Sequence, residues 1–165
     1  MKYNFFINCS RMAYHVHLHT SAPHTTSLNT PLVERYQMSL NPSIVVIEDS
    51  PTQARAIAAY LEGYGIIPIV AQDGPPGMMA VLQHKPAAVI LDVNLPTMNG
   101  FQIARRLKRH ADTSQIPVIM LTSLDDTADM CTGLDNGADY YIPKGPHASE
   151  ELYKTLCGFG LIAWH

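Results

Sequence analysis

Three acidic side chains stand directly after apolar runs of this sequence, and together they could bind a metal ion. Asp92 follows the run 87–91, and Glu48 and Asp49 follow the run 43–47. Adjacent carboxylates after a buried strand are costly together unless a cation neutralises them. Three carboxylates form an all-oxygen ligand set, which suits Mg²⁺ or Mn²⁺. The ordinary alternative is that Glu48 and Asp49 only cap the helix that follows them.

Two more polar groups follow apolar runs later in the chain. Thr122 and Ser123 come directly after the run 116–121, and Lys144 comes just after the run 140–142. A hydroxyl there can donate a hydrogen bond to a phosphoryl oxygen, and a lysine can neutralise part of the charge of three carboxylates. Taken singly, the hydroxyls also fit a helix cap, and the lysine also fits a solvated loop charge. A metal, a lysine and a hydroxyl that converge on one carboxylate together suit phosphoryl transfer.

The elements that must position these side chains alternate between strand and helix. Short apolar runs rich in β-branched residues predict buried parallel strands, and the amphipathic stretches between them predict helices. The predicted strands are 43–47, 66–71, 87–91, 116–121 and 140–142. The predicted helices are about 51–63, 76–84, 99–110, 126–136 and 149–158. This alternation predicts an α/β fold, a doubly wound five-stranded parallel sheet with its site at the carboxyl ends of the strands.

The composition is that of a globular protein. The chain has 165 residues, of which 47% are apolar and 15% are charged, and its formal net charge is -3. That charge gives no electrostatic footprint for nucleic acid, so no nucleic-acid partner is expected. No apolar run approaches the roughly 18 residues of a membrane-spanning helix, so no membrane partner is expected. Three cysteines without paired spacing favour free thiols in a reducing cytosol, and we expect a cytoplasmic protein.

The first part of the chain differs from the rest. Residues 1–42 contain four Asp, Glu, Lys or Arg side chains and show no sustained helical period. We interpret them as an N-terminal extension that is either disordered or translated from a start codon assigned too early, with Met38 as the alternative start. The folded domain is expected over residues 43–160, with a short tail at 161–165.

Residues 43–160 resemble the receiver domain of two-component response regulators, which has a flavodoxin-like (βα)5 fold. Four motifs carry the resemblance in chain order. They are the acidic pair Glu48-Asp49, the box L-D-x-x-L-P-x-M-N-G around Asp92, the triplet Leu121-Thr122-Ser123, and the run G-A-D-Y-Y-I-P-K that ends at Lys144. Any one of them alone would be weak evidence, but four in order on the predicted strands are specific.

The resemblance implies a role for each site residue. Asp92 would accept a phosphoryl group from a phosphohistidine of a sensor histidine kinase or phosphotransfer protein, and water would later remove it. Lys144 would pair with the phosphoryl group, and Thr122 would hydrogen-bond one of its oxygens. Mg²⁺, or Mn²⁺ in its place, would be held by Glu48, Asp49, Asp92 and the backbone carbonyl of Asn94.

The resemblance also implies a conformational switch. Tyr141 matches the family's aromatic switch position. Phosphorylation would draw Thr122 toward the phosphate and let Tyr141 turn inward. An unknown downstream protein would bind the surface that changes, formed by the helix at 126–136, the strand at 140–142 and the helix at 149–158. We therefore expect a phosphoacceptor signalling protein and not an enzyme that turns over a metabolite.

One departure from the family pattern and several alternatives stay open. The family usually places proline, often in a cis peptide, after its lysine, whereas this chain has Gly145, so the geometry of that loop is open. A receiver-like scaffold that is never phosphorylated and a receiver fragment of a larger multidomain regulator are alternatives. Among enzymes on a similar sheet, a flavodoxin-like cofactor binder would need a phosphate loop in place of 48–51. An aspartyl phosphatase would place an acid where this chain has Asn94.

Overall fold

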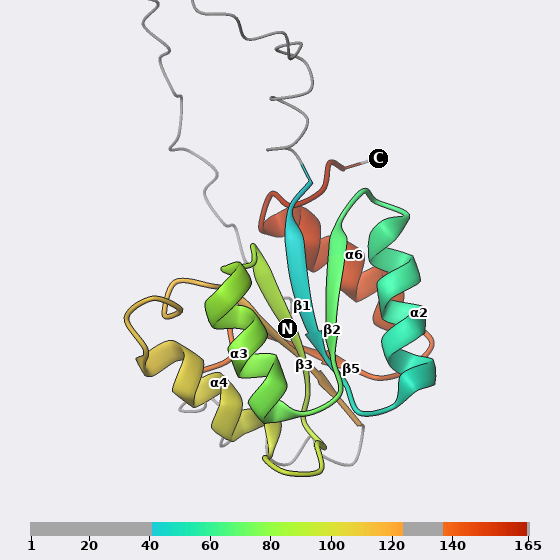
Figure 1. Ribbon diagram of the computed structural model, residues 1–165. Coiled ribbons are helices and arrows are strands. Elements are labelled where there is room, and N and C mark those ends of the chain that lie inside the picture. Colours follow the sequence, from blue (N-terminus) through green and yellow to red (C-terminus); the bar gives the residue numbers. More distant parts are fainter. Residues whose placement is uncertain (1–40, 124–136, 165) are drawn as a thin grey trace, which may run out of the picture. The chain divides into compact units, whose positions relative to one another are not determined.

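The computed structural model describes residues 41–123 and 137–164, which contain a parallel five-stranded sheet (Figure 1). The strands are β1 (Ser43–Ile47), β2 (Ile67–Ala71), β3 (Ala88–Asp92), β4 (Val118–Thr122) and β5 (Tyr140–Pro143). The helices of these residues are α2 (Pro51–Glu62), α3 (Gly74–His84), α4 (Gly100–Arg109) and α6 (Ala148–Gly158). The strand order is β2-β1-β3-β4-β5, and every neighbouring pair runs parallel. This is the order of flavodoxin-like doubly wound sheets, so the predicted fold class is confirmed.

Helices cover both faces of the sheet (Figure 1). Alternate strand residues belong to the two opposite cores. The core between the sheet, α2 and α6 includes Ile44, Val46, Ile90, Leu61 and Leu156. The core between the sheet, α3 and α4 includes Val45, Ile47, Leu91, Val81 and Ile103. Strands β1, β3 and β4 are almost entirely buried. Burial on both faces explains why their sequences are continuous apolar runs and do not alternate with polar residues.

Several boundaries near the strand ends differ from the predicted ones, and two of these differences bear on the site. Helix α3 begins at Gly74, two residues before the predicted start, because Asp73 caps it. Pro75 and Pro76 fall in its first turn, where a helix needs no backbone N–H donor. Strand β3 extends one residue further than predicted, so that Asp92 is the last residue of the strand.

Some predicted features lie outside the described residues. These are the helix at 126–136 and residues 1–40 of the extension. Of the C-terminal tail, Leu161 and Ile162 pack against the core beside α6. Within residues 41–123 and 137–164, no helix has the length and apolar character needed to cross a membrane.

Gly100 brings the start of α4 close to the end of β3. Its backbone amide donates a hydrogen bond to the carbonyl of Val93 (2.9 Å). A Cβ at this position would overlap the carbonyl oxygen of Asp92 and lie 2.9 Å from the Cα of Val93. The preceding Asn99 caps the helix by accepting a hydrogen bond from the amide of Phe101 (2.8 Å). The absence of a side chain at Gly100 therefore lets the first turn of α4 hold the backbone of Asp92 in place.

We expect Gly100→Ala to lower the free energy of unfolding by about 2 kcal/mol or more, because the added methyl group meets backbone atoms that cannot rotate away. Gly145→Ala is the matched control, since a Cβ there meets no atom within 4 Å. Its effect should stay below about 0.5 kcal/mol. Urea denaturation measures both changes. Equal stability of Gly100→Ala and the wild-type protein would show that this contact does not restrain the backbone of Asp92.

Candidate functional site

The acidic side chains lie where the strand order of the sheet reverses. Strand β1 has β2 on one side and β3 on the other, and the sheet continues from β3 to β4 and β5. In doubly wound sheets, ligands bind at this switch point, outside the carboxyl ends of the strands. The register pairs Ile47 with Leu91, so the residues that follow, Glu48 and Asp92, stand at neighbouring strand ends.

The three predicted carboxylates do come together. Glu48, Asp49 and Asp92 each offer one carboxylate oxygen, and these oxygens lie within 4.8 Å of one another. Glu48 and Asp92 are only 1% and 5% exposed, whereas Asp49 is exposed to solvent. Three hard oxygen donors with one side open to water fit Mg²⁺, which keeps several of its own water ligands.

Lys144 bridges two of the three carboxylates. Its Nζ lies 3.0 Å from Oε2 of Glu48 and 2.9 Å from Oδ1 of Asp92. Burial by itself would lower the pKa of the Lys144 ammonium, but the hydrogen bonds and charges of the two carboxylates outweigh burial and raise that pKa. Lys144 therefore carries its charge inside the site, and it connects the end of β5 to the ends of β1 and β3.

The charge of the site is not balanced by this one ammonium. Burial raises the pKa of Glu48 above its ordinary value, and the nearby charge of Asp92 raises it further. The hydrogen bond from Lys144 and the backbone amide of Ser50, 3.3 Å from Oε1, act in the opposite direction without compensating. Three carboxylates thus face one ammonium among these residues, and an added cation would be favourable here.

Thr122 lies at the end of β4 and is completely buried. Its hydroxyl donates a hydrogen bond to the backbone carbonyl of Ser123 (3.1 Å). Its own backbone carbonyl accepts a hydrogen bond from the amide of Lys144 (2.6 Å). The backbone of Thr122 is therefore tied to the lysine, whereas its hydroxyl would have to rotate to reach a group attached to Asp92.

The remaining predicted residues lie at the margin of the site. Tyr141 is partly buried on the face of the sheet that carries α4, with its ring centroid 6.4 Å from that of Phe101. Burial raises the pKa of the Tyr141 hydroxyl. Asn94 is exposed and follows Asp92 by two residues in the loop that leads to α4. The structure therefore brings the three carboxylates and Lys144 together, while Tyr141 contacts α4.

Sequence reasoning missed two residues beside the site. Gly100 holds the backbone of Asp92, and Asp73 joins the start of α3 to Thr97 in the loop after Asp92. Both belong to turn dipeptides, Asn-Gly and Asp-Gly, that the sequence displays openly. The sequence does not show which other loop each of them contacts, because those contacts are long-range.

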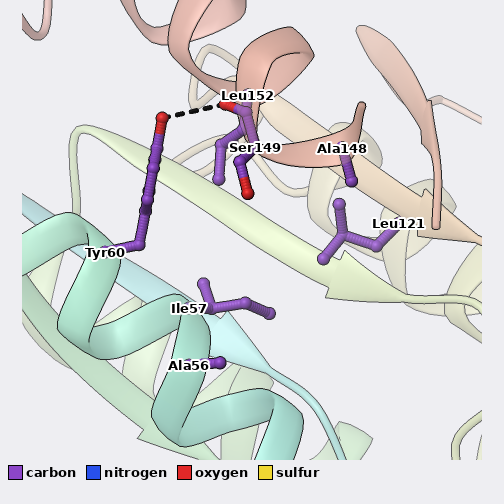
Figure 2. A pocket seen from close by; sticks show the side chains of 7 residues that line it. All are labelled: Ala56, Ile57, Tyr60, Leu121, Ala148, Ser149 and Leu152. Carbon is purple, nitrogen blue, oxygen red and sulfur yellow. Dashed lines mark hydrogen bonds between the residues drawn. The ribbon is translucent and has the colours of Figure 1, made fainter. Parts of the chain in front are cut away.

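Two pockets lie close to these strand ends. Figure 2 shows one of about 160 Å³ between α2 and α6, where the hydroxyl of Tyr60 donates a hydrogen bond to the carbonyl of Ser149 (2.8 Å). Its lining residues in the described part of the chain carry no charge. The other, of about 230 Å³, runs beside Lys144 along the loop that contains Gly145. The open space at Gly145 lies along this second pocket.

Comparison with known proteins gives consistent findings. The family model described as the response regulator receiver domain matches residues 44–156. Protein PilH of Pseudomonas aeruginosa is 39% identical over 113 residues, which cover 68% of this chain and 93% of PilH. The DNA-binding response regulator MtrA of Mycolicibacterium smegmatis is 40% identical over 109 residues, which cover 66% of this chain but 46% of MtrA. The signal receiver domain of a signal transduction histidine kinase from Syntrophus aciditrophicus has a TM-score of 0.66 and 32% identity, over 75% of this chain and 95% of that one.

We expect Glu48→Gln to raise the free energy of unfolding of the metal-free protein at neutral pH, because it removes a buried charge that burial and Asp92 both disfavour. The folded-state pKa of Glu48 lies above the ordinary value of 4.5. The protonation of Glu48 therefore stabilises the folded protein. This stabilisation is fully present below that value and is lost as the pH rises through the folded-state pKa. Urea titrations at a series of pH values should show the wild-type protein losing stability relative to the variant in that window.

Glu62→Gln, at the exposed end of α2, is the matched control for this experiment and should follow the wild-type curve. A Glu48→Gln protein less stable than the wild type at every pH would show that the ion pair with Lys144 outweighs the burial of the charge.

Proposed function

Because this chain belongs to the response regulator receiver domain family, we propose that it receives a phosphoryl group on Asp92 and signals through contacts that depend on that modification. The observation that carries the proposal is the 2.9 Å contact between Lys144 Nζ and Asp92 Oδ1. It puts a cation beside the carboxylate whose oxygens would bear a phosphoryl group. Asp92 also ends a central strand of the sheet, between Glu48 at the end of β1 and Thr122 at the end of β4.

The chemistry of the transfer follows from these positions. A carboxylate oxygen of Asp92 forms a P–O bond while the P–N bond of a phosphohistidine breaks, and the departing imidazole takes up a proton. Lys144 neutralises charge on the transferred oxygens, and the Thr122 hydroxyl, after rotating away from Ser123, donates to one of them. The product is a mixed anhydride, which water can hydrolyse. The mark is therefore reversible, and autodephosphorylation belongs to the proposal.

The donor set supports a resident Mg²⁺, and Mn²⁺ has the same ligand preferences. The residues that would hold it are Glu48, Asp49, Asp92 and the backbone carbonyl of Asn94. When bound, such an ion supplies Lewis-acid stabilisation of the charge on the transferred group. The excess of carboxylates over ammonium groups in the site favours this assignment.

The output would be a change of surface. Withdrawal of the Thr122 hydroxyl toward the phosphoryl group opens space beside β4, and Tyr141 could then leave its contact with Phe101 and turn inward. The altered surface would include β5 and α6, together with the predicted helix at 126–136, which lies outside the described residues. We propose a sensor histidine kinase or phosphotransfer protein as the donor and a downstream protein, rather than nucleic acid, as the reader. We place the exchange in the cytoplasm, as three cysteines without paired spacing in the sequence suggest.

The first test is covalent modification. With Mg²⁺ and acetyl phosphate, the intact protein should gain the mass of one phosphoryl group, and Asp92→Asn should not. The matched control is Asp112→Asn, which removes an exposed acid outside the site and should gain the same mass as the wild type. Chelation of Mg²⁺ should abolish the gain. A folded wild-type protein that remains unmodified would contradict the proposal and favour a receiver-like scaffold that is never phosphorylated.

The second test concerns the switch. Beryllofluoride with Mg²⁺ should shift the amide and ring NMR signals of Tyr141 in the wild-type protein. Thr122→Ala should lose most of that shift, because no hydroxyl is left to move toward the bound group. Thr122→Ser keeps the hydroxyl and should behave like the wild type. If Tyr141 still showed the full shift in Thr122→Ala, Tyr141 would respond independently of the Thr122 hydroxyl, and the proposed coupling would be wrong.

A further inference from the structure

We propose that Asp73 and Thr97 form a positioning pair that holds the loop at 93–99 in the conformation needed to bind the metal ion. This inference rests on the proposed function, since the metal is the ion that phosphoryl transfer would require. Neither residue belongs to the acidic cluster. Both would act through Asn94, whose backbone carbonyl is the fourth proposed ligand and which lies in the same loop.

Asp73 makes hydrogen bonds in two directions. Its Oδ1 accepts from the backbone amide of Gly74 (2.7 Å), which caps α3. The same oxygen accepts from the backbone amide of Thr97 (3.3 Å), and its Oδ2 accepts from the Thr97 hydroxyl. One carboxylate therefore joins the start of α3 to a loop 24 residues further along the chain. The hydrogen bonds that it receives lower the pKa of Asp73, with the one from the Thr97 hydroxyl contributing most.

Hydrogen bonds that do not involve Asp73 hold the two ends of the same loop. At its beginning, the amide of Val93 donates to the carbonyl of Leu121 (3.3 Å), and the carbonyl of Val93 accepts from Gly100 (2.9 Å). At its end, Asn99 caps α4. Asn94 lies between Val93 and Thr97. The hydrogen bonds between Thr97 and Asp73 thus restrict the motion of the part of the loop that contains the proposed ligand.

Packing supports the same contact. A Cβ at Gly74 would lie 3.3 Å from Cβ of Met98 and 2.7 Å from Cδ1 of Ile103, so the start of α3 lies directly against the loop and the first turns of α4. Met98 also packs against the core on that face of the sheet. The loop is therefore pressed onto α3 at Met98 and hydrogen-bonded to it at Thr97.

An ordinary helix cap is the simplest other role for Asp73, and the structure offers variants that separate the two roles. Thr97→Val removes the hydroxyl and leaves the cap of α3 intact. Thr97→Ser keeps the hydroxyl and is the matched control. Asp73→Ser keeps a good N-cap residue but lacks the second oxygen that Thr97 uses. Thr97 is exposed, so its substitution should not disturb the core.

The test measures metal binding and loop motion without phosphorylation. Titration calorimetry gives the Mg²⁺ dissociation constant of each full-length protein, and amide hydrogen exchange of the metal-free proteins reports on residues 93–99. Thr97→Val and Asp73→Ser should each weaken Mg²⁺ binding by about 3- to 10-fold, at or below the lower end of the range for residues that orient a metal ligand. Both should speed amide exchange in the loop, and the double variant should be little worse than either alone.

Unchanged Mg²⁺ affinity in Thr97→Val, with Thr97→Ser also unchanged, would overturn the positioning role and leave Asp73 as a helix cap. Weakened binding in Thr97→Val together with wild-type affinity in Thr97→Ser would support it. A folded wild-type protein that binds no Mg²⁺ would overturn this inference and the metal-dependent part of the proposed function together. If the wild-type protein binds Mg²⁺ and Thr97→Val binds it with the same affinity, the positioning role is wrong and the proposed function is unaffected.

Discussion

The ammonium of Lys144 lies between two buried carboxylates that come from different strands, Glu48 after β1 and Asp92 at the end of β3. Buried charges persist only with partners, and loss of the ammonium, which would leave two buried carboxylates without a cation, typically costs roughly 3–5 kcal/mol. The contact requires that three strands end at the same edge of the sheet. Strand register, helix starts and loop lengths around the site therefore have to agree with this one arrangement of charges.

The same charges explain how the site is held together in the folded protein and why a bound cation or a phosphoryl group would change its charge balance. One ammonium holds the metal-free site together, but the carboxylates outnumber it, and burial, with the charge of Asp92 adding to it, raises the pKa of Glu48. A cation would relieve the imbalance, and a phosphoryl group on Asp92 would add negative charge again. Thr122 lies where it can respond to that change, because its backbone carbonyl accepts a hydrogen bond from the amide of Lys144 while its hydroxyl donates one to the carbonyl of its neighbour Ser123.

The loop after Asp92 shows how residues outside the cluster can support its geometry. Gly100 removes a side chain so that the first turn of α4 can approach the carbonyl of Asp92, and Asp73 reaches Thr97 from the start of α3. Both contacts join segments that are separate in the chain. They fix backbone atoms, which is what a carbonyl ligand in this loop would need.

Much of the fold could be predicted from the sequence because its signals are local. Runs such as 87–91 are apolar throughout because their strands are buried on both faces, and acids placed just beyond such runs must fall at strand ends. The meeting of Glu48, Asp49 and Asp92 then follows from a parallel sheet with this strand order. The sequence pattern predicts the start of α3 two residues too late, since two successive prolines resemble a turn until a capping residue such as Asp73 is identified.

By itself, then, the sequence determined the family, the sheet and the set of polar groups at its carboxyl edge. Only the tertiary structure decided that Lys144 pairs with both Glu48 and Asp92, that the Thr122 hydroxyl bonds to Ser123, and that Asp73 meets Thr97. The physical reason is that residue types and spacing specify which strand end a side chain occupies. The direction of a hydroxyl or the reach of a carboxylate depends on packing between segments far apart in the chain.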